Sequence, residues 1–355
     1  MSKINSLIKA NGAITIADFM QEAMFNEKTG YYRTKEPIGA RADFITAPEI
    51  SSVFGELIAA YFLSFILKSD KEISFVEMGA GLGTLYSDAL STFAKIATKL
   101  EKLDEIKRRI NFNIVEISEK LTKVQQEKLA QSGFKINWFN NFEDFIATNQ
   151  NRQIYFLANE LFDCFQIHQF ARTNNKWQEV LVGLKNKELC LTLENFSQEK
   201  HVLINKIALE NNISQNQEDI IFEHSFAALN FMEKLSKTLK SQGGIALIID
   251  YGYENPPLKS TLQALKNHQG KNILEDVGNC DLTALVNFKA LQKTAQKYNL
   301  QTSLVSQKEF LTSLGIQERQ GSNTNPNVNS AINRLIGEDQ MGELFKCLIL
   351  WENEL

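Results

Sequence analysis

The sequence predicts an α/β fold in which helices cover both faces of a mostly parallel sheet. Three observations support this prediction: short apolar runs recur along the chain, helical patterns separate them, and a glycine-rich turn follows the first run. Parallel strands are buried on both faces, so they appear as continuous apolar runs without alternation. Such a sheet binds its ligands at the carboxyl ends of its strands.

The composition is that of an ordinary soluble protein with one large domain or two smaller ones. Of the 355 residues, 43% are hydrophobic and 23% are charged, and the formal net charge is −4. Because there is no basic surplus, we expect no nucleic-acid partner. No run of about 18 apolar residues occurs, so we expect no membrane insertion.

The cysteines and the N-terminal residues bear on the compartment. The four cysteines are far apart and form no Cys-x-x-Cys motif, which predicts reduced thiols and neither a metal site nor a disulfide framework. No arginine precedes Arg33, and Asp18 and Glu22 are acidic, which argues against a mitochondrial transit peptide. We therefore expect a bacterial cytoplasmic protein rather than one of the mitochondrial matrix.

Residues 1–70 are expected to form a helical extension that covers the binding site. Apolar residues recur at helical spacing over 16–25 and over 51–67, and each pattern predicts a helix. Glycines and prolines between these two stretches predict a connecting loop. Residues 71–355 are then expected to form the main domain.

Five apolar runs of the main domain are predicted to be strands of the parallel sheet. They cover residues 74–78, 113–117, 135–139, 154–158 and 245–249. Helical patterns follow the first two runs, from Thr84 and over 118–130, as alternating strands and helices require. The long interval between these runs leaves room for an extra helix within 92–109.

Residues 164–240 do not follow this alternation of apolar strands and helices. We interpret them as a partly antiparallel β insertion. Apolar and polar residues alternate over 167–172 and 176–182 around a Thr-Asn-Asn turn, and this predicts a β-hairpin. A further strand is expected over 188–193. Near the end of the chain, the apolar stretch 341–351 predicts a terminal helix.

The turn after the first run carries the clearest binding signal. Gly79, Gly81 and Gly83 permit a tight turn and a close approach of a ligand to the backbone. Their spacing departs by one residue from the Gly-x-Gly-x-x-Gly turn that binds dinucleotides. Glu77, two residues before the first glycine, suits a ligand with an ammonium and a sulfonium group. A plain strand-to-helix turn without a ligand is the alternative.

Glu116 ends the second run, where a carboxylate can accept both ribose hydroxyls of a nucleoside. A solvated glutamate at a strand end is the alternative. Together with the glycine turn, Glu116 favours a nucleoside cofactor, and the acidic Glu77 favours S-adenosyl-L-methionine.

Three polar residues, Asn159, Glu160 and Asp163, close the fourth run. Burying such groups costs free energy unless they bind a ligand or reach water. Glu160 and Asp163 can clamp a guanidinium and hold its nitrogen toward a methyl donor. The alternative for Asp163 is a cap on the next helix.

Several segments together resemble the MidA family, which comprises bacterial proteins and the mitochondrial complex I assembly factor 7. The similar segments include Gly30-Tyr31-Tyr32, Asp43–Glu49, Phe54–Leu57, Glu77–Leu85, Val115–Leu121, Asn159–Asp163, Asp250-Tyr251-Gly252 and Asp281–Ala284. The similarity spans nearly the whole chain. It implies a class I, Rossmann-like methyltransferase fold that uses S-adenosyl-L-methionine.

The resemblance also implies roles for individual residues. By matching position, Gly79, Gly81, Gly83 and Glu116 hold the cofactor. Asn159, Glu160 and Asp163 face the acceptor, which for the mitochondrial relative is an arginine of a complex I subunit that becomes symmetrically dimethylated.

Three positions depart from the family pattern: Ala42 replaces a glycine, Leu285 replaces a histidine, and Asn287 replaces an acid. We therefore keep two hypotheses, a methyltransferase acting on an arginine of a complex I subunit and a catalytically weak assembly factor that binds S-adenosyl-L-methionine. A nicotinamide-dependent oxidoreductase is a third. The oligomeric state stays open, with a homodimer as one alternative.

Overall fold

The computed structural model describes residues 3–34, 46–214, 216–321 and 325–352, and the chain divides into two compact units. We call them the sheet unit (Ile38–Phe162, Met232–Gly252 and Gln292–Leu355) and the antiparallel unit (Met1–Pro37, Asp163–Phe231 and Tyr253–Leu291). Each is assembled from three separate stretches of sequence. The departure at Ala42 lies outside the residues that the structure describes.

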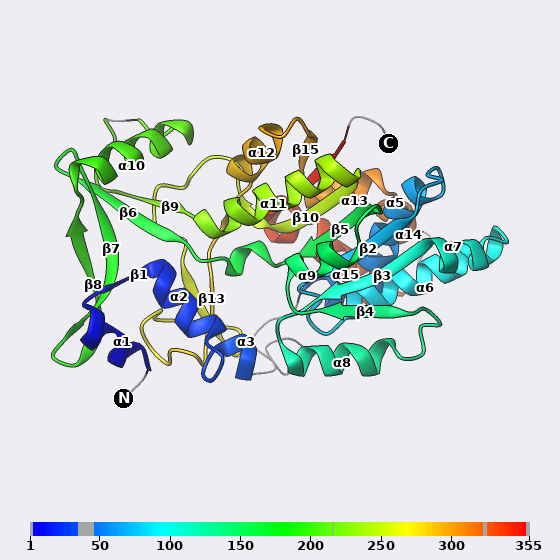
Figure 1. Ribbon diagram of the computed structural model, residues 1–355, viewed down its shortest axis with the longest axis horizontal. Coiled ribbons are helices and arrows are strands. Elements are labelled where there is room, and N and C mark those ends of the chain that lie inside the picture. Colours follow the sequence, from blue (N-terminus) through cyan, green and yellow to red (C-terminus); the bar gives the residue numbers. More distant parts are fainter. Residues whose placement is uncertain (1–2, 35–45, 215, 322–324, 353–355) are drawn as a thin grey trace. The chain divides into compact units, whose positions relative to one another are not determined.

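The sheet unit is built on one large sheet (Figure 1), in which strands follow one another in the order β15-β16-β10-β5-β2-β3-β4. The strands from β10 to β4 run parallel, whereas β16 is antiparallel to both of its neighbours. The bounds are β2 Ile73–Met78, β3 Ile110–Val115, β4 Ile136–Phe139, β5 Gln153–Asn159, β10 Gly244–Tyr253, β15 Gln301–Ser306 and β16 Phe345–Trp351. The mostly parallel sheet and its five predicted strands are thereby confirmed.

Both faces of this sheet are buried under helices. Phe75 and Tyr155 belong to the core cluster on one face, where Phe62 of α5 packs against Phe75 with ring centroids 5.3 Å apart. Phe156 alternates to the other face and is equally buried, 6.0 Å from the ring of Phe142 on α9. The helices that lie wholly within this unit are α4 Ala47–Ile50, α5 Ser52–Ile66, α6 Thr84–Lys99, α7 Leu103–Arg109, α8 Glu119–Leu129, α9 Phe142–Thr148, α13 Gln307–Ser313, α14 Ile316–Gly321 and α15 Pro326–Ile336, and most of α11 (Phe226–Gln242) also belongs to it.

The strand order creates a switch point beside β2. From β2 the chain continues through β3 to β4 in one direction, and β5 then pairs with the other edge of β2. Loops that leave the carboxyl ends of β2 and β5 therefore diverge, and a crevice for a ligand forms at such a point.

The antiparallel unit contains the predicted hairpin and more of the chain than expected. β6 (His168–Thr173) pairs with β7 (Lys176–Lys185) through a turn in which Asn174 and Asn175 both have positive φ, as a two-residue hairpin requires. β1 (Ile14–Thr15), β8 (Glu188–Asn195) and β9 (Ile220–His224) complete this sheet. A smaller sheet joins β11 Gln263–Lys266, β12 Gln269–Lys271 and β13 Asp281–Thr283.

The helices within residues 1–70 are divided between the two units. α1 (Lys3–Asn11), α2 (Ile16–Phe25) and α3 (Tyr31–Thr34) lie in the antiparallel unit, whereas α5 packs in the core of the main sheet. α5 is apolar nearly all round, and a helix of that kind is buried rather than laid on a surface. The antiparallel unit takes in Asp163–Phe231 of the expected insertion at 164–240 and also Tyr253–Leu291, whereas residues 232–240 belong to the sheet unit.

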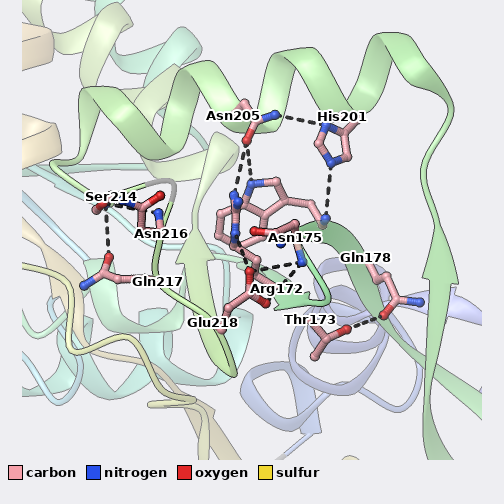
Figure 2. Close-up of polar contacts among 11 residues, drawn as sticks. Arg172, Thr173, Asn175, Gln178, His201, Asn205, Ser214, Asn216, Gln217 and Glu218 are labelled. Atoms are coloured by element: carbon pink, nitrogen blue, oxygen red, sulfur yellow. Dashed lines mark hydrogen bonds and ion pairs between the residues drawn. The ribbon is translucent and has the colours of Figure 1, made fainter.

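A polar cluster fastens α10 (Gln198–Glu210) to the hairpin of β6 and β7 (Figure 2). The Arg172 guanidinium is buried, lies 5.4 Å from the centroid of the Trp177 ring and ion-pairs with Glu218 at 3.7 Å. Asn205 of α10 accepts hydrogen bonds from the Trp177 indole at 2.9 Å and from Arg172 at 3.5 Å. The charge of Arg172 is thus compensated where it is buried, as burial of an ion requires.

The predicted terminal helix over 341–351 is wrong, because residues Phe345–Trp351 form strand β16. Cys347, Leu348 and Leu350 are fully buried between β10 and β15. A strand buried on both faces is apolar at successive positions, so its sequence resembles that of a buried helix.

Two further findings concern the chain as a whole. Within the described ranges, none of the helices combines the length and apolar character needed to span a membrane. The four cysteines are free thiols.

Candidate cofactor site at the carboxyl ends of β2, β3 and β5

The turn that follows β2 requires its glycines. Gly79, Gly81 and Gly83 have φ values of +73°, +53° and +73°, a left-handed conformation that costs other L-residues about 1–2 kcal/mol. A Cβ on Gly79 would also lie 2.7 Å from Cδ1 of Leu161. Because these glycines have no side chains, the backbone of the turn can approach a ligand closely.

The first turn of α6 points its amides toward the same region. Gly83 precedes the helix and provides no side-chain cap. The N–H groups of a first helical turn have no partner within the helix and carry partial positive charge. They can accordingly donate to an anionic or polar group of a ligand.

Replacing Gly79 by alanine should destabilise the protein by about 2 kcal/mol or more, because left-handed strain adds to the contact with Leu161. Gly12 is the matched control, since its φ is +84° but a Cβ there meets nothing within 4 Å. Thermal and denaturant unfolding of both variants check this expectation. Equal losses in the two variants would show that the Leu161 contact is harmless.

Glu77 is a buried carboxyl at the end of β2. Its side chain is 2% exposed, and Oε2 has no hydrogen-bond partner among the described residues. Burial, with a smaller contribution from Glu116, raises the pKa of Glu77 to about 8. A buried acceptor without a partner costs free energy. A cationic group of a ligand would offset this cost, because the Glu77 carboxyl would ionise and pair with it.

Glu116 directly follows β3 and is 6% exposed. Its Oε1 accepts from the amide of Ser118 at 2.9 Å, and its Oε2 accepts from Gln125 Nε2 at 3.1 Å. Gln125 was not singled out from the sequence. The available signal was its place on α8 between Leu121 and Leu129, a polar residue within a buried apolar stripe.

Of the predicted acceptor residues, Asn159 ends β5, next to β2 in the sheet, and Glu160 directly follows it. Asn159 is 7% exposed; its Nδ2 donates to Glu160 Oε1 at 3.3 Å, and its Oδ1 has no partner in the described part of the chain. Glu160 Oε1 also accepts from the Ala47 amide at 3.0 Å, and its φ is +50°. A glutamate held in a left-handed conformation is strained, and such strain clusters at functional sites.

Asp163 is the first residue of the antiparallel unit, whereas Asn159, Glu160 and the glycine turn belong to the sheet unit. It lies within the short 3-10 helix η1 (Phe162–Cys164) rather than at the N-cap of a helix. Asp163, Asp281 and Cys164 are acidic groups close enough to the Tyr32 hydroxyl to affect its ionisation. Burial foremost, and then these groups, raise the pKa of Tyr32 well above its usual range.

Asp250 has a structural explanation. The side chain is fully buried in β10 and accepts hydrogen bonds from the amides of Phe162 and Tyr251, both at 2.8 Å. It thereby fixes the backbone that follows the acceptor residues of β5.

The departure at 287 is accounted for by local structure, whereas the side chain at 285 has no structural explanation. Asn287 Oδ1 accepts from the Ala290 amide at 3.0 Å at the start of α12 (Phe288–Gln296), and its Nδ2 donates to Asn211 at 2.9 Å. Leu285 is held through its backbone amide, which donates to Thr261 Oγ1 at 2.9 Å. An aspartate can provide the same cap as Asn287.

We expect Asn287→Asp to lose less stability than Asn287→Ala, which should lose about 1 kcal/mol or more. Aspartate keeps the oxygen that caps α12 but loses the amide that donates to Asn211, whereas alanine loses both. Denaturant unfolding provides the measurement. A loss in Asn287→Asp as large as that in Asn287→Ala would show that capping is not the role of this residue.

The sequence of this chain is similar to those of known methyltransferases. A family model described as "Putative S-adenosyl-L-methionine-dependent methyltransferase" matches residues 57–306. Protein arginine methyltransferase NDUFAF7 of Danio rerio is 32% identical over 98% of this chain and 85% of its own length. The same-named human protein is 29% identical over 97% and 81%.

Among solved structures, a Burkholderia thailandensis protein crystallised with S-adenosyl-homocysteine has a TM-score of 0.83 at 22% identity, covering 98% of this chain and 90% of its own. This likeness supports the class I methyltransferase fold. Taken with the glycine turn and the family match over most of the sheet unit, it leads to one identification. The chain belongs to a family of S-adenosyl-L-methionine-dependent methyltransferases.

Proposed function

We propose that this enzyme transfers a methyl group from S-adenosyl-L-methionine to an arginine side chain of a protein. The observation that carries the proposal is the buried Glu77 carboxyl, with an oxygen lacking a partner in the described part of the structure, beside a turn in which three glycines have positive φ. The arginine acceptor is supported by the relatives, which are named protein arginine methyltransferases.

The residues of the sheet unit fit the cofactor group by group. Glu77 would bind the ammonium of the methionine moiety, and Glu116 would accept from the ribose hydroxyls, as a carboxylate at the end of the neighbouring strand can. Gly79, Gly81 and Gly83 would let the ligand lie against the backbone. The cofactor supplies a methyl group activated by a positively charged sulfur.

Glu160 and Asn159 are the residues we propose for the acceptor, with Asp163 as a second carboxylate. A guanidinium binds carboxylates through paired, charge-assisted hydrogen bonds. Held in this way, its nitrogen would be aligned with the methyl group, and alignment supplies most of the rate of such a transfer. Glu160 would also neutralise the cation and keep the nucleophilic nitrogen oriented.

The resemblance to the MidA family extends the proposal to the acceptor protein, a subunit of respiratory complex I. Free thiols at all four cysteines agree with a reducing compartment such as the cytoplasm. The alternative, an assembly factor without catalysis, rested on the departures at Leu285 and Asn287. Since Asn287 caps a helix as an acid can, the departure at this position does not favour a loss of activity.

Incubation with labelled S-adenosyl-L-methionine and cell extract, followed by mass spectrometry of labelled proteins, tests the proposal. We expect label in dimethylated arginine of one main protein. Calorimetry with the same cofactor separates the alternatives: binding without transfer supports the assembly factor, and absence of binding contradicts both.

A further inference from the structure

Gln125 is a buried polar side chain in an otherwise apolar stripe of α8. Its neighbours on the buried face are Leu121 and Leu129, one turn before and one turn after it. Gln125 itself has no exposed surface. A buried amide is costly unless its donors and its acceptor are satisfied, so its partners explain why a glutamine stands here.

The three hydrogen bonds of Gln125 fix the orientation of its amide. Trp138 Nε1 lies 3.2 Å from Gln125 Oε1, and an indole N–H can only donate. The oxygen must therefore face Trp138, which turns Nε2 toward two acceptors. Nε2 donates to the Gly81 carbonyl at 2.9 Å and to Glu116 Oε2 at 3.1 Å.

These bonds join the two parts of the candidate cofactor site to the edge of the sheet. Gly81 belongs to the turn after β2, Glu116 directly follows β3, and Trp138 lies on β4. The stem of Gln125 also packs beneath the turn, since a Cβ on Gly83 would lie 3.3 Å from Gln125 Cγ. One side chain thus sets the position of the turn relative to that of the carboxylate.

We propose that Gln125 is a positioning residue that holds Glu116 and the glycine turn in the arrangement needed to bind an adenosyl ribose. This inference rests on the proposed cofactor site. Gln125 acts through Glu116 and Gly81 and need not touch the ligand.

The chemistry of the side chain fits this task better than the alternatives. A neutral amide orients the Glu116 carboxylate without neutralising it, so the charge stays available for ribose hydroxyls. A lysine would pair with the carboxylate, and a glutamate would repel it and lack the donors. Leucine or methionine would fill the space and leave the Gly81 carbonyl and the Trp138 indole without this partner.

The test compares the binding of S-adenosyl-homocysteine and its 2′-deoxyribose analogue by calorimetry. We expect the wild-type protein to prefer the ribose form. Gln125→Met should weaken the binding of S-adenosyl-homocysteine by about tenfold. It should also reduce the preference for the ribose form to less than about a third of the wild-type preference. These losses are expected when an orienting hydrogen bond is removed. The matched control is Gln126→Met, on the exposed face of the same helix, which should change neither quantity.

Further measurements separate positioning from folding and from cofactor binding itself. Trp138→Phe keeps Gln125 and removes the indole donor together with part of the ring volume, so an intermediate loss of preference is expected. If Gln125→Met does not fold, the Trp138→Phe variant tests the inference. Weaker binding of both ligands with an unchanged preference would overturn the inference, as would unchanged binding. If the wild-type protein binds neither ligand, the proposed cofactor site itself fails.

Discussion

Replacing Glu77 by glutamine is expected to weaken the binding of S-adenosyl-L-methionine by about 10- to 100-fold at pH 7.5. The variant keeps the shape of the side chain but cannot carry the charge that would pair with the ligand's ammonium. A hydrogen bond to a charged group contributes about 1.5–3 kcal/mol, and about 1.4 kcal/mol corresponds to a tenfold change in affinity. Calorimetry gives the dissociation constants, and Glu127→Gln on the exposed side of α8 is the control.

The same residue predicts a pH dependence of cofactor binding. The pKa of Glu77 is raised to about 8, so the carboxyl is mostly protonated below that pH and must lose a proton to pair with a cation. Affinity should therefore rise by about 10- to 30-fold from pH 6.0 to 7.5, with release of a proton. The range ends there because an α-amino group begins to deprotonate at about pH 8.

Two outcomes test whether ionisation of Glu77 causes this pH dependence. The affinities of wild-type protein and Glu77→Gln should converge toward pH 6, because protonated glutamate and glutamine are both neutral. Calorimetry in buffers of different ionisation enthalpy should detect the released proton in the wild type alone. A wild-type affinity that does not change with pH contradicts the assignment of Glu77 to the ammonium.

The raised pKa of Glu77 also affects the stability of the free protein, which should fall as pH rises, whereas the affinity for the cofactor should rise. The carboxyl stays protonated in the folded state up to about pH 8, whereas it ionises near pH 4.3 in the unfolded chain. The folded state therefore binds more protons between these values, and the contribution of Glu77 to the free energy of unfolding falls as pH rises through this window.

Replacing Glu160 by glutamine should lower the rate of methyl transfer by about 100-fold or more and change the affinity for cofactor by less than about threefold. The reason is that a glutamine can accept the hydrogen bond from Ala47 but cannot neutralise a guanidinium. A loss confined to the chemical step indicates an interaction made with the acceptor in the transition state.

Glu101→Gln is the matched control for this variant, because Glu101 also has a positive φ, of 57°, and is exposed. Turnover is measured with an identified acceptor, and cofactor binding by calorimetry on the same samples. Unchanged turnover in Glu160→Gln would contradict the proposed role of Glu160 in binding the acceptor guanidinium. Loss of cofactor affinity in parallel with turnover would instead assign Glu160 to the cofactor.

Much of the sheet unit was predictable because its strands are local apolar runs with turn residues at their carboxyl ends. The glycine turn and Glu116 could be found for the same reason, since parallel strands bring their ends to one edge. The roles of Glu77, Glu116 and Glu160 stay predictions until the experiments above are done.

Other features depend on contacts between distant parts of the chain. β16 was mistaken for a helix because its burial on both faces comes from β10 and β15, which lie far away in sequence. The hydrogen bonds of Gln125 join three strand ends and cannot be inferred from its neighbours in sequence. The division into units is likewise a property of long-range packing.

The discontinuous layout of the two units has a consequence for biosynthesis. β10 is made well before β16, its neighbour in the sheet, so one edge of β10 waits uncovered while the intervening chain leaves the ribosome. Pairing over such sequence separations is slow because a long loop must close first. An uncovered apolar edge invites aggregation, so nascent chains should depend on chaperones until Phe345–Trp351 has emerged.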